Sequence, residues 1–187
     1  MKEAILMSTN PEWVLMTLNG DKIIEIRKTK PKRKLPIDVY IHCTMQDPNS
    51  GNALAIMIGN HLGNGKVVAK FTLREVEKIT MRKIWGEWEV YGEHTDFIEL
   101  CRKSCLEQDE IMDYMGGDRH AYAWHISDLV IFDKPKELSE FRYKKVTMKW
   151  DENYHHRIVK KEIVPVKRPP QSWQYVEVKD KDEIRRR

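Results

Sequence analysis

The sequence predicts an α+β protein, mostly β, in which a small β-barrel carries flanking helices. Short segments of alternating apolar and polar residues recur along the chain. Irregular connections separate these segments, and only two or three stretches carry helix signals. The 187 residues, 41% of them hydrophobic, are enough for one domain with a proper core and rather few for two.

The first elements are a strand and a helix. Residues 4–8, AILMS, form a short apolar run of the kind found in buried strands. Residues 9–20 then carry a full set of helix signals. Asn10 can cap the helix, Pro11 suits its first position, and Gly20 suits the position after its end.

The next element is a strand at residues 22–28, KIIEIRK. Side chains alternate between the two faces of a strand, so Glu25 and Arg27 share one face and Ile24 and Ile26 the other. A carboxylate beside a guanidinium forms a charge-assisted pair that can bind the edge of a base or fix a polar pocket. The alternative is an ordinary ion pair on a solvated strand face.

The remaining elements are less uniform. Four more segments predict strands because their apolar residues alternate or run together: residues 38–44, 66–76, 121–132 and 169–178. Residues 105–117 predict a helix that ends at one of its two final glycines, and residues 134–141 a short helix or turn. Residues 45–66 predict an irregular connection, whereas the aromatic-rich residues 84–97 give no clear signal.

Positive charge gathers in two segments, although the net charge is only +4. Residues 27–34 hold six Lys or Arg and no acid, and Pro31 and Pro36 keep this run extended. Residues 142–168 hold nine Lys or Arg and three acids. Extended cations suit phosphate contacts, and a solubilising loop is the alternative.

The three cysteines raise the question of a metal site. Cys101 and Cys105, with His94 and His120 nearby in sequence, have a wider spacing than a typical zinc site and lack a second cysteine pair. We therefore expect no metal and place the pair in the core, on one helix face. Cys43 is in phase with the apolar residues of its strand, and an odd, sparse count favours a reducing compartment.

Missing signals exclude several classes of protein. The N-terminal apolar run is too short for a signal peptide, and no apolar stretch approaches the roughly 20 residues that cross a bilayer. The glycine-rich residues 59–65 precede a strand rather than the helix that a phosphate-binding loop needs. We expect a cytoplasmic protein with no membrane partner and no cofactor.

Three stretches together resemble the ASCH domain, a branch of the PUA-like superfamily. They are residues 11–31, 121–141 and 168–177, and the last two resemble a bacterial and phage subgroup. The family's Gly-x-Lys-x-x-Glu-x-Arg signature is matched by Gly20, Lys22, Glu25 and Arg27. The resemblance implies a PUA-like barrel of five or six strands, with a cleft in its wall lined by the signature. It also implies a single domain over residues 1–178, with a basic insertion at 142–167 and a polar tail at 179–187.

The function that this resemblance implies is nucleic-acid binding, because related PUA-like domains bind RNA or modified bases. The expected partner is RNA or another nucleic acid, or a modified nucleotide, and the oligomeric state is left open. The expected nucleic-acid-binding residues are Arg27, Lys28, Lys30, Lys32, Arg33, Lys34, Lys144 and Lys145. Aromatic residues that could stack on a base, if they face the cleft, are Trp13, Tyr122, Trp124, Trp173 and Tyr175.

A hydrolase is the alternative function. One ASCH branch is similar to an amidohydrolase that removes the acetyl group of acetylated cytidine with a Lys, a Thr three residues later and a more distant Glu. Lys22 matches the first position, Glu25 replaces the Thr, and Glu99 and Glu107 are candidates for the third. The catalytic candidates of this alternative, or of a ribonuclease, are thus Lys22 and Glu25. A third interpretation is a phage or host interaction protein that kept the fold and lost the ligand.

Overall fold

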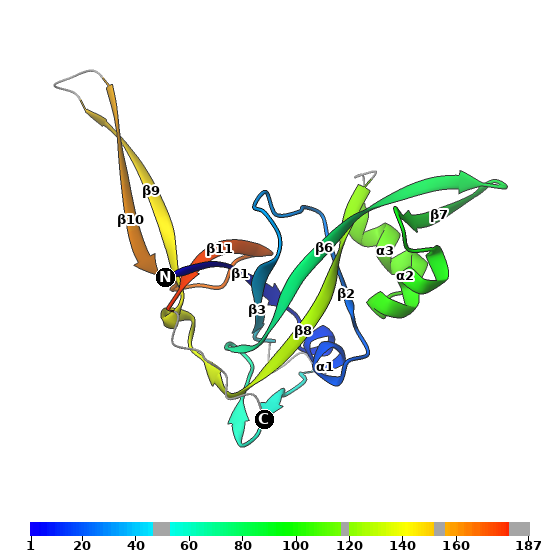
Figure 1. Ribbon diagram of the computed structural model, residues 1–187, viewed down its shortest axis with the longest axis horizontal. Helices are drawn as coiled ribbons and strands as arrows, with labels where there is room; N and C mark the ends of the chain where they lie inside the picture. The colour runs from blue at the N-terminus through cyan, green and yellow to red at the C-terminus, as the bar shows by residue number, and fades with distance from the viewer. Residues whose placement is uncertain (47–52, 117–119, 152–155, 180–187) are drawn as a thin grey trace.

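The computed structural model describes residues 1–46, 53–116, 120–151 and 156–179, which form a mostly β protein (Figure 1). In chain order the elements are β1 (Lys2–Thr9), α1 (Pro11–Asn19), β2 (Ile24–Arg27), β3 (Ile37–Cys43), β4 (Met57–Ile58), β5 (His61–Leu62), β6 (Val67–Ile84), β7 (Glu87–Gly92), α2 (Phe97–Ser104), α3 (Gln108–Met115), β8 (His120–Lys136), the 3-10 helix η1 (Leu138–Glu140), β9 (Arg142–Asp151), β10 (His156–Pro165) and β11 (Trp173–Val178). The α+β class is confirmed.

One nine-stranded mixed sheet forms the body of the protein. Its strand order is β10-β9-β11-β1-β3-β6-β8-β2, and β7 pairs with β6. The pairing of β1 with β3 is parallel and the other pairings in this sheet are antiparallel. The expected barrel is not confirmed, because the end strands of the described sheet, β2 and β10, do not pair with each other. The opening lies between β2 and the part of β11 that β9 leaves unpaired.

The sheet nevertheless curls until the inner faces of distant strands touch. The rings of Trp124 on β8 and Trp173 on β11 lie edge to face, with centroids 5.3 Å apart, and Tyr175 packs on Trp173 in the same way. Side chains span the opening where a closed barrel would have a backbone ladder. Arg27 Nη1 donates to Ser172 Oγ at 3.2 Å, and Trp173 Nε1 donates to Thr29 Oγ1 at 3.0 Å.

Apolar clusters lie on both faces of the sheet. One cluster, which includes Trp124, fills the inside of the curl. Another lies between the sheet and helices α2 and α3, where Ile24 and Ile79 from the strands meet Leu100 and Ile111 from the helices. Ile24 faces these helices. Side chains alternate along a strand, so Glu25 and Arg27 of β2 point to the opposite face of the sheet.

Two expectations about residues 84–117 are wrong or incomplete. The helix expected at residues 105–117 begins only at Gln108, while the unassigned residues 84–97 contain β7 and the start of α2. Helix α2 ends at Ser104, and Cys105 adopts a left-handed backbone with φ of 55°. Cys101 and Cys105 therefore do not lie on one face of a continuous helix.

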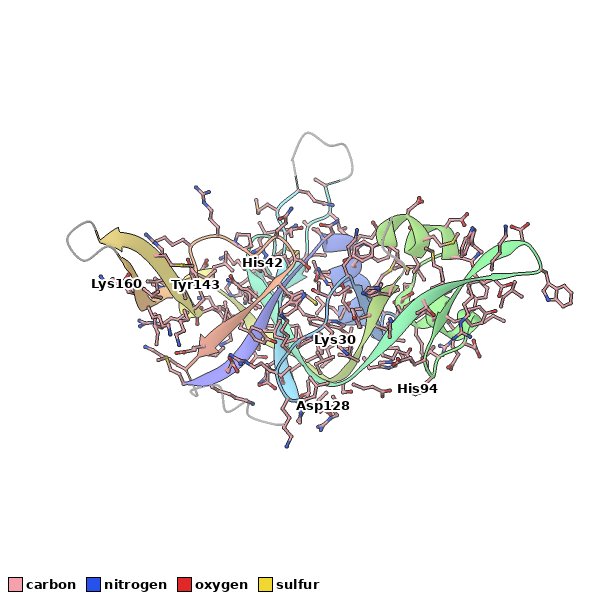
Figure 2. The ribbon with its side chains drawn as sticks, turned by 90° about the horizontal axis from the view of Figure 1, so that it is seen from above. Lys30, His42, His94, Asp128, Tyr143 and Lys160 are labelled. Carbon is pink, nitrogen blue, oxygen red and sulfur yellow. The ribbon has the colours of Figure 1, made fainter. Side chains whose placement is uncertain are left out.

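The basic segment at 142–167 contains the β9–β10 hairpin, which projects from the sheet (Figure 1). Its base joins the body where Arg142 pairs with Glu177 of β11. Seen from above, Tyr143 and Lys160 of this hairpin and His94 lie toward opposite ends of an elongated molecule, with Lys30 between them (Figure 2). Most of the tail expected at 179–187 falls outside the described residues, and the extent of the domain stays a prediction. None of the helices in the described ranges is long and apolar enough to cross a membrane.

Candidate functional site

The turn between α1 and β2 sends Lys22 into the protein interior. Helix α1 ends where expected, at Gly20, whose φ of 83° reverses the chain. The Lys22 side chain is only 3% exposed, and its Nζ donates to the Ser104 carbonyl oxygen at 2.7 Å. That carbonyl lies at the C-terminal end of α2, where carbonyl groups lack helical partners and a cation is favoured. Lys22 therefore fastens α2 to the turn.

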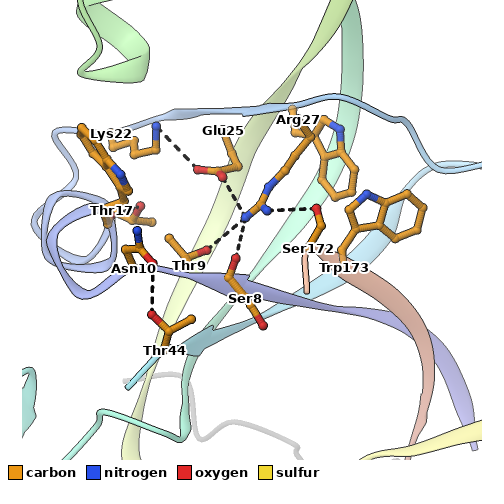
Figure 3. A network of polar contacts seen from close by, with 12 residues as sticks. Ser8, Thr9, Asn10, Thr17, Lys22, Glu25, Arg27, Thr44, Ser172 and Trp173 are labelled. Carbon is orange, nitrogen blue, oxygen red and sulfur yellow. Dashed lines mark hydrogen bonds and ion pairs between the residues drawn. The ribbon is translucent and has the colours of Figure 1, made fainter. Parts of the chain in front are cut away.

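Glu25 lies between two cations (Figure 3). Its Oε1 is 2.9 Å from Arg27 Nη2, and its Oε2 is 3.5 Å from Lys22 Nζ. All three side chains are at most 10% exposed. A carboxylate buried to this degree needs close compensation, which both cations supply. The expected common face of Glu25 and Arg27 is confirmed.

Arg27 ties β2 to two other parts of the chain. Its Nη2 donates to the Ser8 carbonyl oxygen at 2.8 Å and to Thr9 Oγ1 at 3.3 Å, while Nη1 reaches Ser172. The exposed ion pair on a solvated strand face is therefore wrong for this segment. Arg27 Nε and Ser8 Oγ are buried without a hydrogen-bond partner among the described residues, so this wall keeps unused hydrogen-bonding capacity.

A cleft of about 390 Å³ opens against this network. The volume falls in the range of roughly 300–1,000 Å³ that is typical of small-molecule sites. Besides the network, the lining includes Asn10, Trp13, Thr44, Tyr114 and Gln171. Aromatic rings and uncharged hydrogen-bonding groups therefore border a wall of buried charges.

The two aromatic residues of the cleft come from different helices. Trp13 of α1 lies beside Lys22, whose Nζ is 5.3 Å from the ring centroid. Tyr114 of α3 is 39% exposed, and burial of the rest of its ring raises the pKa of its hydroxyl, an effect that Arg27 opposes. The hydroxyl therefore stays protonated at neutral pH and can donate a hydrogen bond. Trp13 was among the aromatic candidates, whereas Tyr114 was missed because its helix spacing resembles that of a core residue.

The basic loop, residues 28–34, leaves β2 at the edge of the cleft. Three of its cations lie over aromatic rings: Lys28 over Tyr114, Lys30 over Tyr122 and Arg33 over Tyr175, at 5.7, 5.4 and 5.3 Å from the ring centroids. Such contacts hold cations in place while leaving them open to water. Lys32 and Lys34 are also exposed.

The other predicted cations lie elsewhere. Lys144 and Lys145 are both exposed on β9, in the projecting hairpin, and as consecutive strand residues they point to opposite faces. The structure thus brings the signature residues and the basic loop together at one site. It puts the hairpin lysines on β9, which pairs with β11, outside the lining of the cleft.

The candidates for a third catalytic residue do not line the cleft. Glu99 pairs with Lys103 along α2 at 3.1 Å, and Glu107 caps the N-terminus of α3. The acid that lines the cleft besides Glu25 is Glu110, whose Oε2 accepts the backbone N–H of Glu107. Neither Glu99 nor Glu107 therefore takes the place in the cleft that the third catalytic residue of the hydrolase branch would need.

Cys43 is buried, whereas Cys101 and Cys105 are only partly buried, so the expected core position of that pair is wrong. Burial raises the pKa of the Cys43 thiol to about 12 and also raises that of Cys101. In the part of the chain that the structure describes, no three His, Cys, Asp or Glu side chains gather as metal ligands would. That the protein needs no zinc remains a prediction.

Comparisons with known proteins address the fold. No protein-family model matches the chain, and no curated protein matches it. Among solved structures, ASCH from Zymomonas mobilis aligns with a TM-score of 0.51 at 15% identity, covering 93% of this chain and 87% of that one. A point-mutant form of the same protein gives a TM-score of 0.51 at 14% identity, with 93% and 88% covered. At such identities the likeness concerns the fold alone, and it agrees with the signature match at residues 20–27: the chain has the ASCH-domain fold.

Proposed function

We propose that the cleft binds one unpaired nucleotide of a nucleic acid, with RNA the expected form, while the basic loop holds the neighbouring phosphates. The observation that carries this proposal is the position of the buried Lys22–Glu25–Arg27 network. It forms one wall of a cleft that two aromatic side chains line and whose edge, at Arg27 and Tyr114, adjoins the basic loop.

The charges divide this site into two parts. Inside the cleft, Lys22 and Arg27 are balanced by Glu25 and Glu110, so its lining favours an uncharged group with donors and acceptors. A nucleobase has these properties, and aromatic rings can stack on its face. The loop outside contains no acid of its own, although Arg33 pairs with Glu3 of β1 at 3.2 Å. Its cations suit the phosphates, which position a strand without reading its sequence.

A salt titration tests the role of the loop. Binding of a labelled single-stranded RNA should weaken as salt rises, with a log–log slope of roughly −0.7 per neutralised phosphate. The double variant Lys32→Ala/Lys34→Ala should flatten that slope by up to about 1.4. The control Arg82→Ala/Lys83→Ala removes the same charge from the β6–β7 hairpin and should leave the slope unchanged. Equal slopes in both variants, or no binding at low salt, would reject the proposal.

Tyr114→Leu tests base binding in the cleft more directly than Arg27→Ala does. Arg27→Ala strands a buried carboxylate and should cost roughly 3–5 kcal/mol of stability, which obscures any effect on binding. Tyr114 is partly exposed, and losing one stacked base should cost about 1–3 kcal/mol of binding, or roughly 5- to 150-fold. The control Trp88→Leu removes an exposed aromatic of β7 that does not line the cleft. Unchanged affinity in Tyr114→Leu would exclude the cleft as the base site.

The hydrolase alternative has one observation in its favour, since Lys22 is buried beside the cleft. A nucleophile or base needs a free lone pair, whereas Lys22 Nζ donates to a helix carbonyl and contacts a carboxylate. The measurement is product formation from acetylated cytidine and from labelled RNA, followed by chromatography. Turnover by the wild type that Lys22→Gln abolishes would replace the binding proposal with the enzymatic one.

A further inference from the structure

The β9–β10 hairpin has two unlike faces. Residues paired across an antiparallel ribbon share a face, and alternate residues along a strand return to it. The register therefore gathers six exposed side chains on one face, here named the arm face: Lys144, Val146, Met148, Val159, Lys161 and Ile163. Its four aliphatic members are 46–65% exposed.

Folding alone does not explain this face. Aliphatic side chains that stay about half exposed gain only part of the free energy of burial, and apolar side chains gathered on a protein surface often mark a contact site. The opposite face shows what a solvated ribbon looks like, because Lys160 and Glu162 form an ion pair there at 2.6 Å beside Lys145. The two faces of one ribbon thus differ in chemistry.

The arm face is continuous with the basic loop. At the base of the β9–β10 hairpin, here called the arm, Arg142 pairs with Glu177 of β11. Tyr175 lies two residues before Glu177, so the arm face continues onto the face of β11 that carries Tyr175. The Tyr175 hydroxyl accepts the backbone N–H groups of Lys32 and Arg33, which belong to the loop. Loop and arm face therefore flank the same side of β11, and a polyanion on the loop can extend along the arm.

The size and charge of the arm select the kind of partner. Ten residues per strand at about 3.3 Å each, over a width of about 10 Å, give a strip of a few hundred Å². A stable protein interface needs about 800 Å² on each side, so a second copy bound through this strip alone is too small a contact. Residues 142–165 carry seven Lys or Arg against three acids, which favours a polyanion.

We propose that the arm face enters the major groove of a B-form DNA duplex. The length of the arm, about 33 Å, matches one helical turn, and this groove admits a two-stranded ribbon. Thymine methyl groups there offer contacts to Val146, Met148 and Val159, while Lys144 and Lys161 reach the flanking phosphates. Duplex RNA fits less well, because its major groove is too narrow and its minor groove displays hydroxyl groups.

This inference rests on the proposed nucleic-acid function, but it assigns a second surface to a second form of nucleic acid. The test measures binding of a labelled 20-base-pair DNA to the full chain and to two double variants. Lys144→Ala/Lys161→Ala, on the arm face, should weaken binding at least tenfold and flatten the salt slope by up to about 1.8. Lys145→Ala/Lys160→Ala removes the same charge from the same strands on the opposite face and should change binding less than threefold.

A third variant tests the aliphatic side chains. Val146→Thr/Val159→Thr keeps shape and β-propensity while removing apolar contact, and it should weaken duplex binding at least threefold at constant salt slope. Equal losses from the two lysine variants, or equal affinity for duplex RNA, would overturn the proposal. A change of oligomeric state in the threonine variant would instead assign the arm face to a second copy. Single-stranded RNA binding by Tyr114→Leu reports on the cleft separately, so either proposal can fail without the other.

Discussion

Two hairpins of similar backbone structure extend from this protein toward opposite ends, and they are stabilised differently (Figure 1). In the β6–β7 hairpin, Ile79 and Val90 are fully buried and pack with residues of α2 and α3. In the β9–β10 hairpin, Val146 and Val159 are each 49% exposed. One ribbon is part of the core, while the other presents its apolar residues to solvent.

The charges of the two hairpins differ in the same way. In residues 79–92, two cations are matched by two acids, whereas residues 142–165 carry a net charge of +4 from seven cations and three acids. A two-stranded ribbon without a covering element is marginally stable in water. The comparison therefore indicates that the β6–β7 hairpin is maintained by its own helices, and that the β9–β10 hairpin is suited to an external partner.

The β6–β7 hairpin, here called the covered hairpin, packs against α2 and α3. The largest expected effect is the loss of stability when one of its buried side chains is truncated. Ile79→Ala should lower the free energy of unfolding by about 2–5 kcal/mol, because it leaves a cavity between β6 and the helices. Val159→Ala, the matched truncation in the bare hairpin, should cost less than about 0.5 kcal/mol. Urea unfolding of both variants measures the difference. Similar costs would mean that the arm is packed in solution and would remove the contrast.

The second prediction concerns the attachment of the covered hairpin to its helices. Glu77 on β6 is 1% exposed, and its Oε2 accepts the backbone N–H groups of His94 and Thr95 at 3.0 and 3.2 Å, in the loop that leads to α2. Glu77→Leu leaves these donors without that acceptor and should cost about 1–3 kcal/mol. Glu77→Gln keeps an acceptor and should cost less.

Trypsin gives an independent measurement on the same variants. In the wild type, cleavage should occur first in the β9–β10 hairpin, whose lysines are exposed on a ribbon that opens easily. In Glu77→Leu, cleavage at Arg82 and Lys83 should approach the rate seen in the arm. An unchanged cleavage order would show that α2 and α3 protect the hairpin without the Glu77 contacts.

Local sequence signals predicted well the part of the site that α1 and β2 form. Pro11 and Gly20 set the limits of α1, and alternation along β2 put Glu25 and Arg27 on one face. Asn10 occupies the N-cap position, but its side chain accepts from Thr44 Oγ1 rather than capping the helix. These features depend on neighbours in sequence, which a single sequence contains. Three of the signature residues, Lys22, Glu25 and Arg27, form one buried network, and their role in binding stays a prediction.

The rest depends on contacts between distant segments. Tyr114 joins the cleft because α3 packs beside β2, and nothing in its helix distinguishes it from a core position. The opening between β2 and β11 is bridged by Ser172 and Trp173, more than 140 residues from their partners. The alternation of residues 84–97 is obscured by a turn built on Trp85, so β7 and α2 were missed.

A third prediction uses acid to act on the strands between the hairpins. His42 on β3 is 2% exposed, and burial lowers its pKa below the ordinary 6.5, partly offset by the Gly65 backbone. The folded state then binds fewer protons, so this contribution to stability is complete above about pH 6.5 and is lost as pH falls toward the lowered value. His42→Gln should flatten the decline in urea midpoint between pH 7 and pH 5. Val159→Ala, in the β9–β10 hairpin, should keep the wild-type dependence of the urea midpoint on pH. If all three proteins showed the same dependence, His42 would not be the group that lowers stability in acid.

The smallest expected effect lies at the tip of the covered hairpin, and its sign is opposite. Ile84 pairs with Glu87 across a two-residue turn in which Trp85 has φ of 53° and Gly86 φ of 96°, as in a type I′ turn. Such turns favour Asn at the first position, and the left-handed backbone is costly for a large side chain. Trp85 is also 100% exposed, so packing does not offset that cost.

Trp85→Asn should therefore raise the free energy of unfolding by a few tenths to about 1 kcal/mol. Trp85→Ala removes the ring but keeps a poor turn residue, and it should change stability little. A loss of stability in Trp85→Asn would show that the ring contacts the protein in solution. A gain would show that this tip, like the arm face, carries an exposed apolar side chain that folding does not require.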